Sequence, residues 1–314
     1  MVADAGVAAT PPTLHRDLAR AITAVENGYM PVETALQQYL GAHPKPASPP
    51  FVVGITGPPG AGKSTVTDAL IERVRARGQT VAVIAVDPSS PFTKGAVLGD
   101  RVRMQHHAAD RGVFIRSMAS RESGGGVAPA SRDALTLVSR SGFDFVVVET
   151  VGVGQVELEI VALADVVLVV SVPGLGDGVQ TIKAGLMEIA DLFAVNMADR
   201  PGANATALQL TQMLRDSGRK VPVVQTVATT GSGIEELLVK LDAARAGETQ
   251  NAARAVQFEV MRTVRDRAAR AALDVLESPR AQVIFSRLAS RALTRAQARC
   301  ELLGLIAGEE SDAD

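Results

Sequence analysis

A nine-residue glycine-rich stretch, Gly57-Pro58-Pro59-Gly60-Ala61-Gly62-Lys63-Ser64-Thr65, constrains this chain more than any other feature. An apolar, β-rich run precedes the stretch at 51–56, and an amphipathic helical pattern follows it at 66–77. Strand, glycine-rich turn and helix in this order are the context of a P-loop, in which backbone N–H groups and a helix N-terminus surround a phosphate. We therefore predict that Lys63 reaches the β- and γ-phosphates of a nucleoside triphosphate and that the Ser64 hydroxyl ligates Mg²⁺.

Apolar β-type runs alternate with helical segments from Phe51 to about Gly247, which indicates an α/β fold with a mostly parallel central sheet flanked by helices. The expected strands are residues 51–56, 80–87, 113–116, 143–149, 166–172, 192–196 and 221–226. Two helices are expected before the sheet, at 14–25 and 32–39, and Ala/Arg/Leu-rich helices are expected after it, at 250–307. A break at Ser278-Pro279 begins a last helix that is expected to continue through Leu305.

The chain is expected to contain three parts. These are an N-terminal helical segment at 1–45, a nucleotide-binding domain at 46–247, and a C-terminal helical arm with an acidic tail at 248–314. A net charge of −2 gives no reason to expect a nucleic-acid or membrane partner. A single cysteine excludes a disulfide framework, and the absence of a signal-peptide pattern favours a cytoplasmic location.

The loops that follow the strands carry acidic residues at the edge where ligands bind in parallel sheets. Asp87 ends the second expected strand and Asp100 follows in the next loop; each can hold Mg²⁺ or its water, or position the attacking water, although Asp87 also suits an Asx-turn before Pro88. The fourth strand ends in Glu149, in the manner of a Walker B carboxylate that completes the Mg²⁺ shell. Gln155 can orient water or be a solvated loop residue.

Two later segments suit recognition of a nucleotide base. The sixth strand leads into Asn196-Met197-Ala198-Asp199, and an aspartate there can accept hydrogen bonds from N1–H and the exocyclic amine of guanine. Adenine lacks that pair of donors, so the carboxylate would reject ATP. The segment Thr226-Val227-Ala228 follows the last strand and offers a backbone N–H to the guanine O6.

The order of these motifs resembles the MeaB/ArgK family, the methylmalonyl-CoA mutase-associated GTPases of the SIMIBI class of P-loop GTPases. The matching segments are the P-loop, Asp87-Pro88-Ser89-Ser90, Leu98-Gly99-Asp100, Glu149-Thr150-Val151-Gly152-Val153-Gly154-Gln155, Gly185 after Lys183, and Asn196–Asp199. The Glu-Thr-Val-Gly-Val-Gly-Gln run replaces the usual Asp-x-x-Gly and is specific to this group. The resemblance covers nearly the whole chain, including both helical ends.

The resemblance implies a homodimer of GTPases, held by the C-terminal arms, that hydrolyses GTP slowly to GDP with Mg²⁺. Its implied partner is an adenosylcobalamin-dependent methylmalonyl-CoA mutase, whose cofactor loading the GTPase gates and whose active site it protects. By position, the phosphate and Mg²⁺ set is Lys63, Ser64, Asp87, Asp100 and Glu149. Gly174 to Gly185 matches the mobile segment that senses the partner, and Asp199 matches the guanine reader.

One residue departs from the family pattern. The base motif is normally Asn-Lys-x-Asp, and here Met197 stands in place of the lysine. Methionine keeps the apolar contact but loses the charge-assisted hydrogen bonds, a loss of about 1–3 kcal/mol. We therefore predict that guanine selectivity is retained and that GTP affinity is weakened.

Two other functions use the same P-loop. A small-molecule or protein kinase would need an acceptor pocket and catalytic arginines, for which Arg101, Arg103, Arg116, Arg121 and Arg132 are available. A metal-insertion GTPase of the nickel-chaperone type would need a Cys/His cluster, and the chain has one cysteine and four histidines. His106 and His107 are adjacent on an expected helix, the wrong spacing for two ligands on one face, so we expect them to form a solvated surface. The GTPase chaperone is preferred because Asn196 and Asp199 suit a guanine site.

Overall fold

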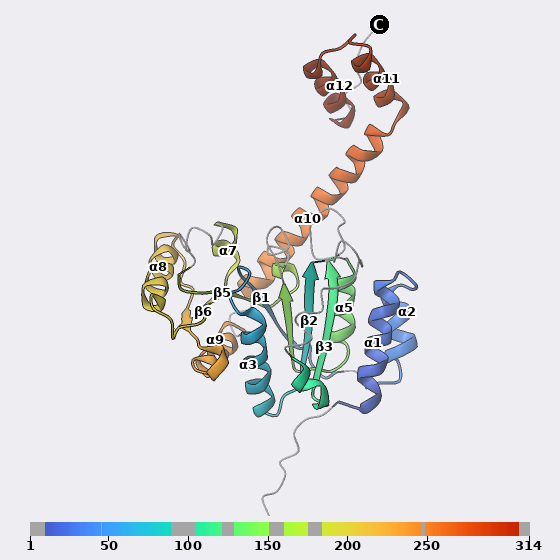
Figure 1. The fold of residues 1–314 in the computed structure, drawn as a ribbon. Coiled ribbons are helices and arrows are strands. Elements are labelled where there is room, and N and C mark those ends of the chain that lie inside the picture. The colour runs from blue at the N-terminus through green and yellow to red at the C-terminus, as the bar shows by residue number, and fades with distance from the viewer. Residues whose placement is uncertain are drawn as a thin grey trace, which may run out of the picture. The chain divides into compact units, whose positions relative to one another are not determined.

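The computed structural model describes residues 10–44, 46–88, 104–120, 129–150, 160–174, 184–245 and 249–307. The chain divides into two compact units, with the boundary between Ala255 and Val256. The first unit contains the sheet and the helices that cover it, and the second is helical (Figure 1).

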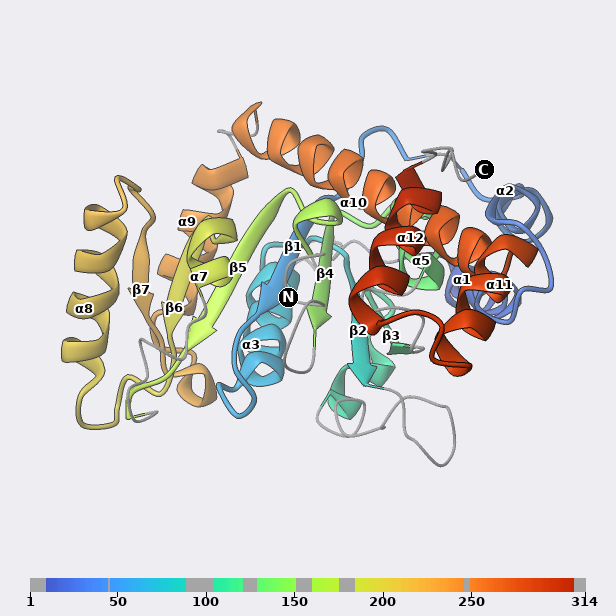
Figure 2. The ribbon, with the colours of Figure 1, turned by 90° about the horizontal axis from the view of Figure 1, so that it is seen from above.

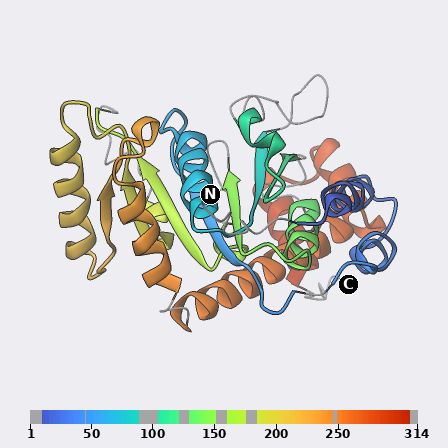
Figure 3. The ribbon, with the colours of Figure 1, turned by 90° about the horizontal axis from the view of Figure 1, so that it is seen from below.

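The first unit is built on a seven-stranded sheet in the order β3-β2-β4-β1-β5-β6-β7 (Figure 1). Every neighbouring pair is parallel, so the predicted α/β fold is confirmed and the described sheet is wholly rather than mostly parallel. Viewed from above and from below, the strands lie side by side across the unit (Figures 2 and 3). The strands are β1 (Phe51–Thr56), β2 (Val81–Pro88), β3 (Val113–Ser120), β4 (Phe145–Thr150), β5 (Val166–Ser171), β6 (Leu192–Val195) and β7 (Val223–Gln225).

Helices bury both faces of this sheet, which explains why its strands are continuous apolar runs. The helices α3 and α9 pack on one face, where they meet side chains such as Val53 and Ile55. On the other face, α1, α2 and α5 cover the β2–β3–β4 part, and α7 and α8 cover β5 and β6. The helices are α1 (Pro12–Glu26), α2 (Val32–Ala35), α3 (Lys63–Ala76), α5 (Pro129–Ser139), α7 (Ala184–Ile189), α8 (Ala203–Asp216) and α9 (Ile234–Arg245). Short π or 3₁₀ turns are η1 (Leu36–Leu40), η2 (Gln105–Ala109), η3 (Ile160–Ala162) and η4 (Ala228–Thr230).

Three aspartates tie neighbouring strands together at their amino ends. Each aspartate directly precedes its own strand: Asp144 precedes β4, Asp165 precedes β5 and Asp191 precedes β6. Its carboxylate accepts the backbone N–H of a residue at the start of the neighbouring strand, and its own N–H donates back to that residue's carbonyl. The carboxylate bonds are Thr80 N to Asp144 Oδ2 at 2.7 Å, Val52 N to Asp165 Oδ2 at 2.8 Å, and Val167 N to Asp191 Oδ2 at 2.9 Å. We call these three pairs the aspartate latches.

The second unit contains most of α10 (Thr249–Leu276), with α11 (Pro279–Ala289) and α12 (Arg295–Ala307). As predicted, Ser278 begins a helix: its side chain accepts the N–H of Ala281 at 3.3 Å. The expectation of one helix through Leu305 was wrong, because the chain turns at 290–294. Arg291 takes a left-handed φ of 60° in that turn, and Thr294 then caps α12.

Candidate functional site

The P-loop follows β1 directly and leads into α3, which begins at Lys63. Gly57 has φ of 140°, and a Cβ at this position would lie 2.1 Å from the carbonyl oxygen of Val170 on β5. Gly62 has φ of 79°, and a Cβ there would lie 2.6 Å from the side-chain nitrogen of Asn196. Both positions therefore require glycine, because neighbouring elements pack closely against the loop and the backbone is left-handed.

Four buried polar groups gather at the start of α3. Lys63 is 6% exposed, and its ammonium donates to the carbonyl oxygens of Gly57 at 2.8 Å and Pro58 at 3.1 Å. Glu149, at 0% exposure, accepts a hydrogen bond from Ser64 Oγ at 2.7 Å and another from Thr67 Oγ1 at 2.8 Å. A buried carboxylate joined to a P-loop hydroxyl is a hard oxygen pair, which suits a divalent cation such as Mg²⁺.

The structure therefore brings Lys63, Ser64 and Glu149 together, as the sequence predicts, and adds Thr67. Thr67 lies three residues after Ser64, so both hydroxyls project from the same side of α3 toward β4. That helical spacing is a signal from which Thr67 could have been found.

Three other residues are predicted to bind Mg²⁺ or to position the attacking water, and of these the structure describes only the backbone of Asp87. The strand register pairs Ala85 with Glu149 and Val86 with Thr150, so the backbone of Asp87 reaches the same carboxyl edge as the end of β4. Asp100 and Gln155 lie outside the described residues.

Asn196 connects three segments of the predicted base side. Its side-chain nitrogen donates to the Ala61 carbonyl at 3.1 Å, and its side-chain oxygen accepts from Thr226 Oγ1 and from the Ala228 N–H, both at 3.2 Å. At 3% exposure, Asn196 therefore braces the P-loop against the segment from Thr226 to Ala228.

The rest of the base motif lies nearer the surface. Met197 is half-buried with a left-handed φ of 55°, and its terminal methyl would lie 3.7 Å from a Cβ at Gly62. Asp199 is exposed, two residues further along. A second hydrogen bond fixes the turn, because the Ala198 N–H donates to the Thr226 carbonyl at 3.0 Å. The exposed carboxylate of Asp199 is thus carried by a segment tied to the Thr226 loop.

The expectation that His106 and His107 form a solvated helix face was wrong for His107, whereas His106 is exposed. His107 is 8% exposed, and its Nε2 lies 2.9 Å from Asp68 Oδ1 on α3. His106 Nε2 lies 3.3 Å from the same oxygen, and the two imidazole centroids are 4.0 Å apart. Because η2 is a short 3₁₀ turn and not an α-helix, its adjacent residues His106 and His107 can both point toward α3.

An ion pair lies at the other end of η2. The Arg75 guanidinium donates to both oxygens of Asp110, at 2.8 and 2.9 Å. The hydrogen bond from Arg75 lowers the pKa of Asp110, with a smaller contribution from the Gly112 N–H. Gly112 leaves room for this pair, since a Cβ there would lie 2.1 Å from the Arg75 guanidinium carbon.

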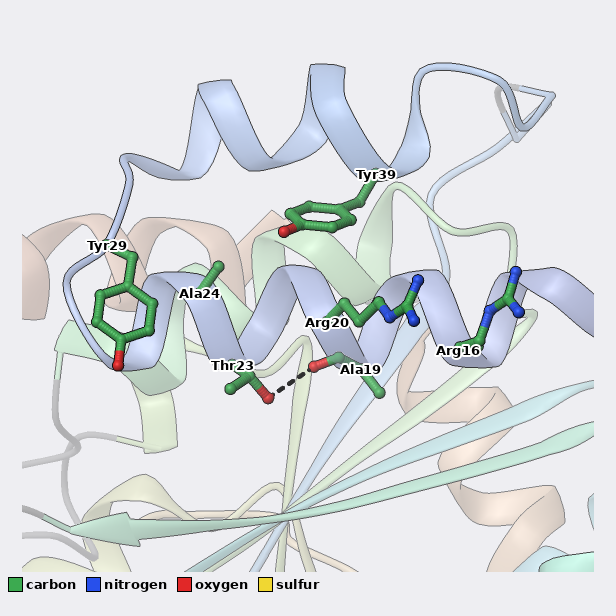
Figure 4. A pocket seen from close by; sticks show the side chains of 7 residues that line it. All are labelled: Arg16, Ala19, Arg20, Thr23, Ala24, Tyr29 and Tyr39. Carbon is green, nitrogen blue, oxygen red and sulfur yellow. Dashed lines mark hydrogen bonds between the residues drawn. The ribbon is translucent and has the colours of Figure 1, made fainter.

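A pocket of about 490 Å³ is lined by α1, the turn after it and η1 (Figure 4). Its lining is Arg16, Ala19, Arg20, Thr23, Ala24, Tyr29 and Tyr39. None of the predicted nucleotide or Mg²⁺ residues lines it. Tyr29 is 76% exposed, so this is a shallow surface hollow rather than an enclosed site.

Comparison with known proteins gives consistent matches. The family model described as methylmalonyl Co-A mutase-associated GTPase MeaB matches residues 18–278. A protein of Pyrococcus abyssi, provisionally named a GTPase, is 54% identical over 233 residues, which are 72% of this chain and 71% of that protein. GTPase ArgK of Escherichia coli is 39% identical over 224 residues, 70% of this chain and 67% of that protein.

Two further matches extend the comparison. A fused isobutyryl-CoA mutase of Cupriavidus metallidurans is 42% identical over 193 residues, which are 60% of this chain but only 17% of that protein. The crystal structure of an LAO/AO transport system kinase superposes with a TM-score of 0.63 at 25% identity, covering 94% of this chain and 95% of that one. Among the described helices, none has both the length and the hydropathy to cross a lipid bilayer.

The P-loop on an all-parallel sheet, the family match over most of the length and the similarity to GTPase ArgK agree with one another. This chain belongs to the MeaB family of methylmalonyl-CoA mutase-associated P-loop GTPases.

Proposed function

We propose that this protein is a Mg²⁺-dependent GTP-hydrolysing chaperone of an adenosylcobalamin-dependent methylmalonyl-CoA mutase. In this role it gates loading of the cofactor and protects the mutase active site. The observation that carries the proposal is the Cupriavidus relative, in which a segment 42% identical to this chain is part of a fused isobutyryl-CoA mutase. A GTPase and a mutase that share one polypeptide are held in a fixed ratio and close together, as partners in one process would be.

The hydrogen-bonded groups at the start of α3 supply the phosphate site in this proposal. The Lys63 ammonium, now on the Gly57 and Pro58 carbonyls, moves to the β- and γ-phosphates of GTP. Ser64 and Glu149, with Asp87 and Asp100, hold Mg²⁺. When bound, Mg²⁺ neutralises the charge that develops on the phosphate oxygens.

The base side supplies selectivity. The exposed Asp199 carboxylate accepts from the N1–H and amine of guanine, and the segment Thr226-Val227-Ala228 offers its backbone. Asn196 ties the P-loop to the segment from Thr226 to Ala228, between which the nucleotide is proposed to bind. Gln155 and Asp100 are the proposed water-positioning residues.

The homodimer is proposed to form through the C-terminal helices. Several large apolar side chains on α10 are more than half exposed within the described structure: Val256 at 60%, Val260 at 55%, Met261 at 65%, Val264 at 57% and Leu273 at 59%. A second copy that packs on Val256, Val260 and Val264 would remove a continuous apolar stripe from water, because these residues repeat every four positions.

The experiment is steady-state hydrolysis of GTP and of ATP by the purified protein, alone and with methylmalonyl-CoA mutase. Slow GTP-selective turnover that rises with the mutase is expected, and a Lys63→Ala variant is the inactive control. Equal turnover of ATP, or turnover indifferent to the mutase, would contradict the proposal.

A kinase is the second candidate, because the superposed structure is that of an LAO/AO transport system kinase. Of the arginines available for phosphoryl transfer, Arg116 donates to Glu26 at 2.7 Å and is engaged with α1. Transfer of label from γ-³²P-GTP to a protein or small-molecule acceptor, rather than to water, would favour the kinase.

A further inference from the structure

Three potential metal ligands converge beside α3, at a place that the GTPase mechanism does not use. Asp68 comes from the second turn of α3, and His106 and His107 come from η2, close to 40 residues further along the chain. One ligand atom from each residue lies within 4.8 Å of the other two, and the Nε2 atoms of both histidines contact Asp68 Oδ1.

The distances fit one small cation. Zinc binds imidazole nitrogen and carboxylate oxygen at about 2.0–2.2 Å, so neighbouring ligand atoms of a tetrahedral site lie about 3.3 Å apart. The separations from Asp68 Oδ1 are 2.9 Å to His107 Nε2 and 3.3 Å to His106 Nε2. Glu72 lies one turn further along α3, and its Oε1 is 3.9 Å from His106 Nε2, within reach of the fourth position.

A structural role for the hydrogen bond between Asp68 and His107 would explain the position of His107 but not that of His106. The contact between Asp68 and the buried His107 would stabilise the packing of η2 by itself. The side chain of His106 is 52% exposed and is free to turn to water, yet it lies against the His107 ring with its Nε2 directed at the same oxygen. Two imidazole nitrogens that converge on one carboxylate oxygen supply the ligand types that zinc takes in proteins.

We propose that Asp68, His106 and His107, with Glu72 or water in the fourth position, bind a zinc-class divalent cation. Imidazole nitrogens select zinc and its neighbours in the transition series over Mg²⁺, which prefers an all-oxygen shell. The cation ties α3 to η2. It is distinct from the Mg²⁺ of the GTPase, which the Ser64 and Glu149 pair would hold.

The site connects two parts of the chain that matter for the nucleotide. The helix α3 begins with Lys63 and Ser64, one turn before Asp68. The η2 turn follows residues 89–103, which contain Asp100, and precedes β3. A bound cation therefore adds a cross-link between the P-loop helix and the chain that returns from the Asp100 segment.

The test uses the full-length protein, stripped with a chelator, free of nucleotide and kept in excess Mg²⁺. Equilibrium dialysis against Zn²⁺ measures stoichiometry and affinity, and Co²⁺ serves as a spectroscopic probe because tetrahedral Co²⁺ absorbs visible light strongly. We expect one equivalent of Zn²⁺ and a tetrahedral Co²⁺ spectrum. The variant is His106→Ala, at a half-exposed position whose truncation leaves the His107–Asp68 hydrogen bond in place.

His43→Ala is the matched control, because His43 also pairs with a carboxylate, at 3.1 Å from Asp17, but has no second imidazole beside it. We expect His106→Ala to weaken Zn²⁺ binding by roughly a hundredfold or more and His43→Ala to leave it unchanged. Failure of the wild type to bind Zn²⁺, or equal binding by His106→Ala and wild type, would overturn the proposal.

A thermal measurement gives an independent readout. A cation that binds only the folded chain raises the melting temperature, so Zn²⁺ should raise that of the wild type and of His43→Ala. The same addition should leave His106→Ala and Asp68→Asn unchanged. An equal rise in all four proteins would place the zinc elsewhere and overturn the assignment.

Discussion

The side-chain amide of Asn196 donates to the carbonyl of Ala61 at 3.1 Å, which joins the segment after β6 directly to the P-loop. The same side chain accepts the Ala228 N–H, so one buried amide holds together the phosphate side and the base side of the proposed GTP site. Sequence motifs suggest that Asn196 reads the base, whereas its observed contacts are with the protein.

Replacing Asn196 should damage both stability and binding. Asn196→Ala leaves the Ala61 carbonyl and the Ala228 N–H without this partner, at about 1–3 kcal/mol for each buried group. We expect a lower melting temperature and weaker GTP binding, measured by calorimetry. Asn204→Ala is the control, since Asn204 makes an exposed hydrogen bond with Gln225 at 2.9 Å and should change neither quantity. Equal effects of the two variants would contradict the bracing role.

The buried carboxylate of Glu149 should be needed for Mg²⁺-dependent turnover. Glu149→Gln keeps the shape and an acceptor for the Ser64 or Thr67 hydroxyl but removes the charge, so the fold should survive. We expect GTP turnover to fall roughly a hundredfold and the Mg²⁺ concentration for half-maximal rate to rise. Thr67→Val, which removes one donor to Glu149, should have a smaller effect on turnover. Unchanged Mg²⁺ dependence in Glu149→Gln would remove Glu149 from the metal site.

Met197 should limit the affinity for GTP. A lysine at this position can brace the P-loop as the family motif does, and Met197 already lies against Gly62. Met197→Lys should therefore lower the GTP dissociation constant by about tenfold, equivalent to about 1.4 kcal/mol. Met213→Lys, at a 38% exposed methionine on α8, controls for added positive charge. An unchanged dissociation constant in Met197→Lys would contradict the prediction.

Two P-loop glycines should differ sharply in their tolerance of a methyl group. Gly57→Ala places a Cβ 2.1 Å from the Val170 oxygen and should cost more than about 3 kcal/mol of unfolding free energy. Gly60→Ala has φ of 78° but no atom within 4 Å of the new Cβ, so it should cost only about 1–2 kcal/mol of backbone strain. Urea unfolding of both variants measures the difference, and similar losses would show that packing against β5 is unimportant.

The Arg75–Asp110 pair should make part of the stability depend on pH. Because Arg75 lowers the pKa of Asp110 in the folded state, the pair stabilises the protein above the unfolded pKa of about 3.9 and loses its effect as the pH falls below it. Asp110→Asn should thus melt at a lower temperature than wild type at neutral pH. That gap should narrow as the pH falls through the unfolded pKa toward the lower pKa that Asp110 has in the folded protein. Asp216→Asn, at an exposed site on α8, should melt like wild type, and a gap constant with pH would contradict the assignment.

The sequence predicts the sheet well because burial on both faces leaves continuous apolar runs, and all seven expected strands are present. The start of α3 is less predictable from the pattern alone, since its first turn consists of P-loop residues with Gly62 in a left-handed conformation before Lys63. The turn before α12 has no glycine or proline, and it depends on the conformation of Arg291 and on the cap formed by Thr294.

Contacts between residues far apart in sequence could not be predicted. The Asp68–His107 pair joins residues 39 positions apart, and Asn196 and Ala61 are 135 apart. Local spacing carries no information on such pairs, which form only when the fold sets α3 beside η2 and the P-loop beside the segment after β6.

The aspartate latches have a consequence for how this scaffold can change. They connect neighbouring strands at the amino ends, whereas the P-loop and Glu149 lie at the carboxyl ends of β1 and β4. The latches hold β2 beside β4, β1 beside β5, and β5 beside β6 at the amino ends of these strands, away from the loops at their carboxyl ends. Loops at the carboxyl ends of these strands can therefore change in length and sequence without a shift in strand register. The same sheet can then support different partners and different rates of hydrolysis.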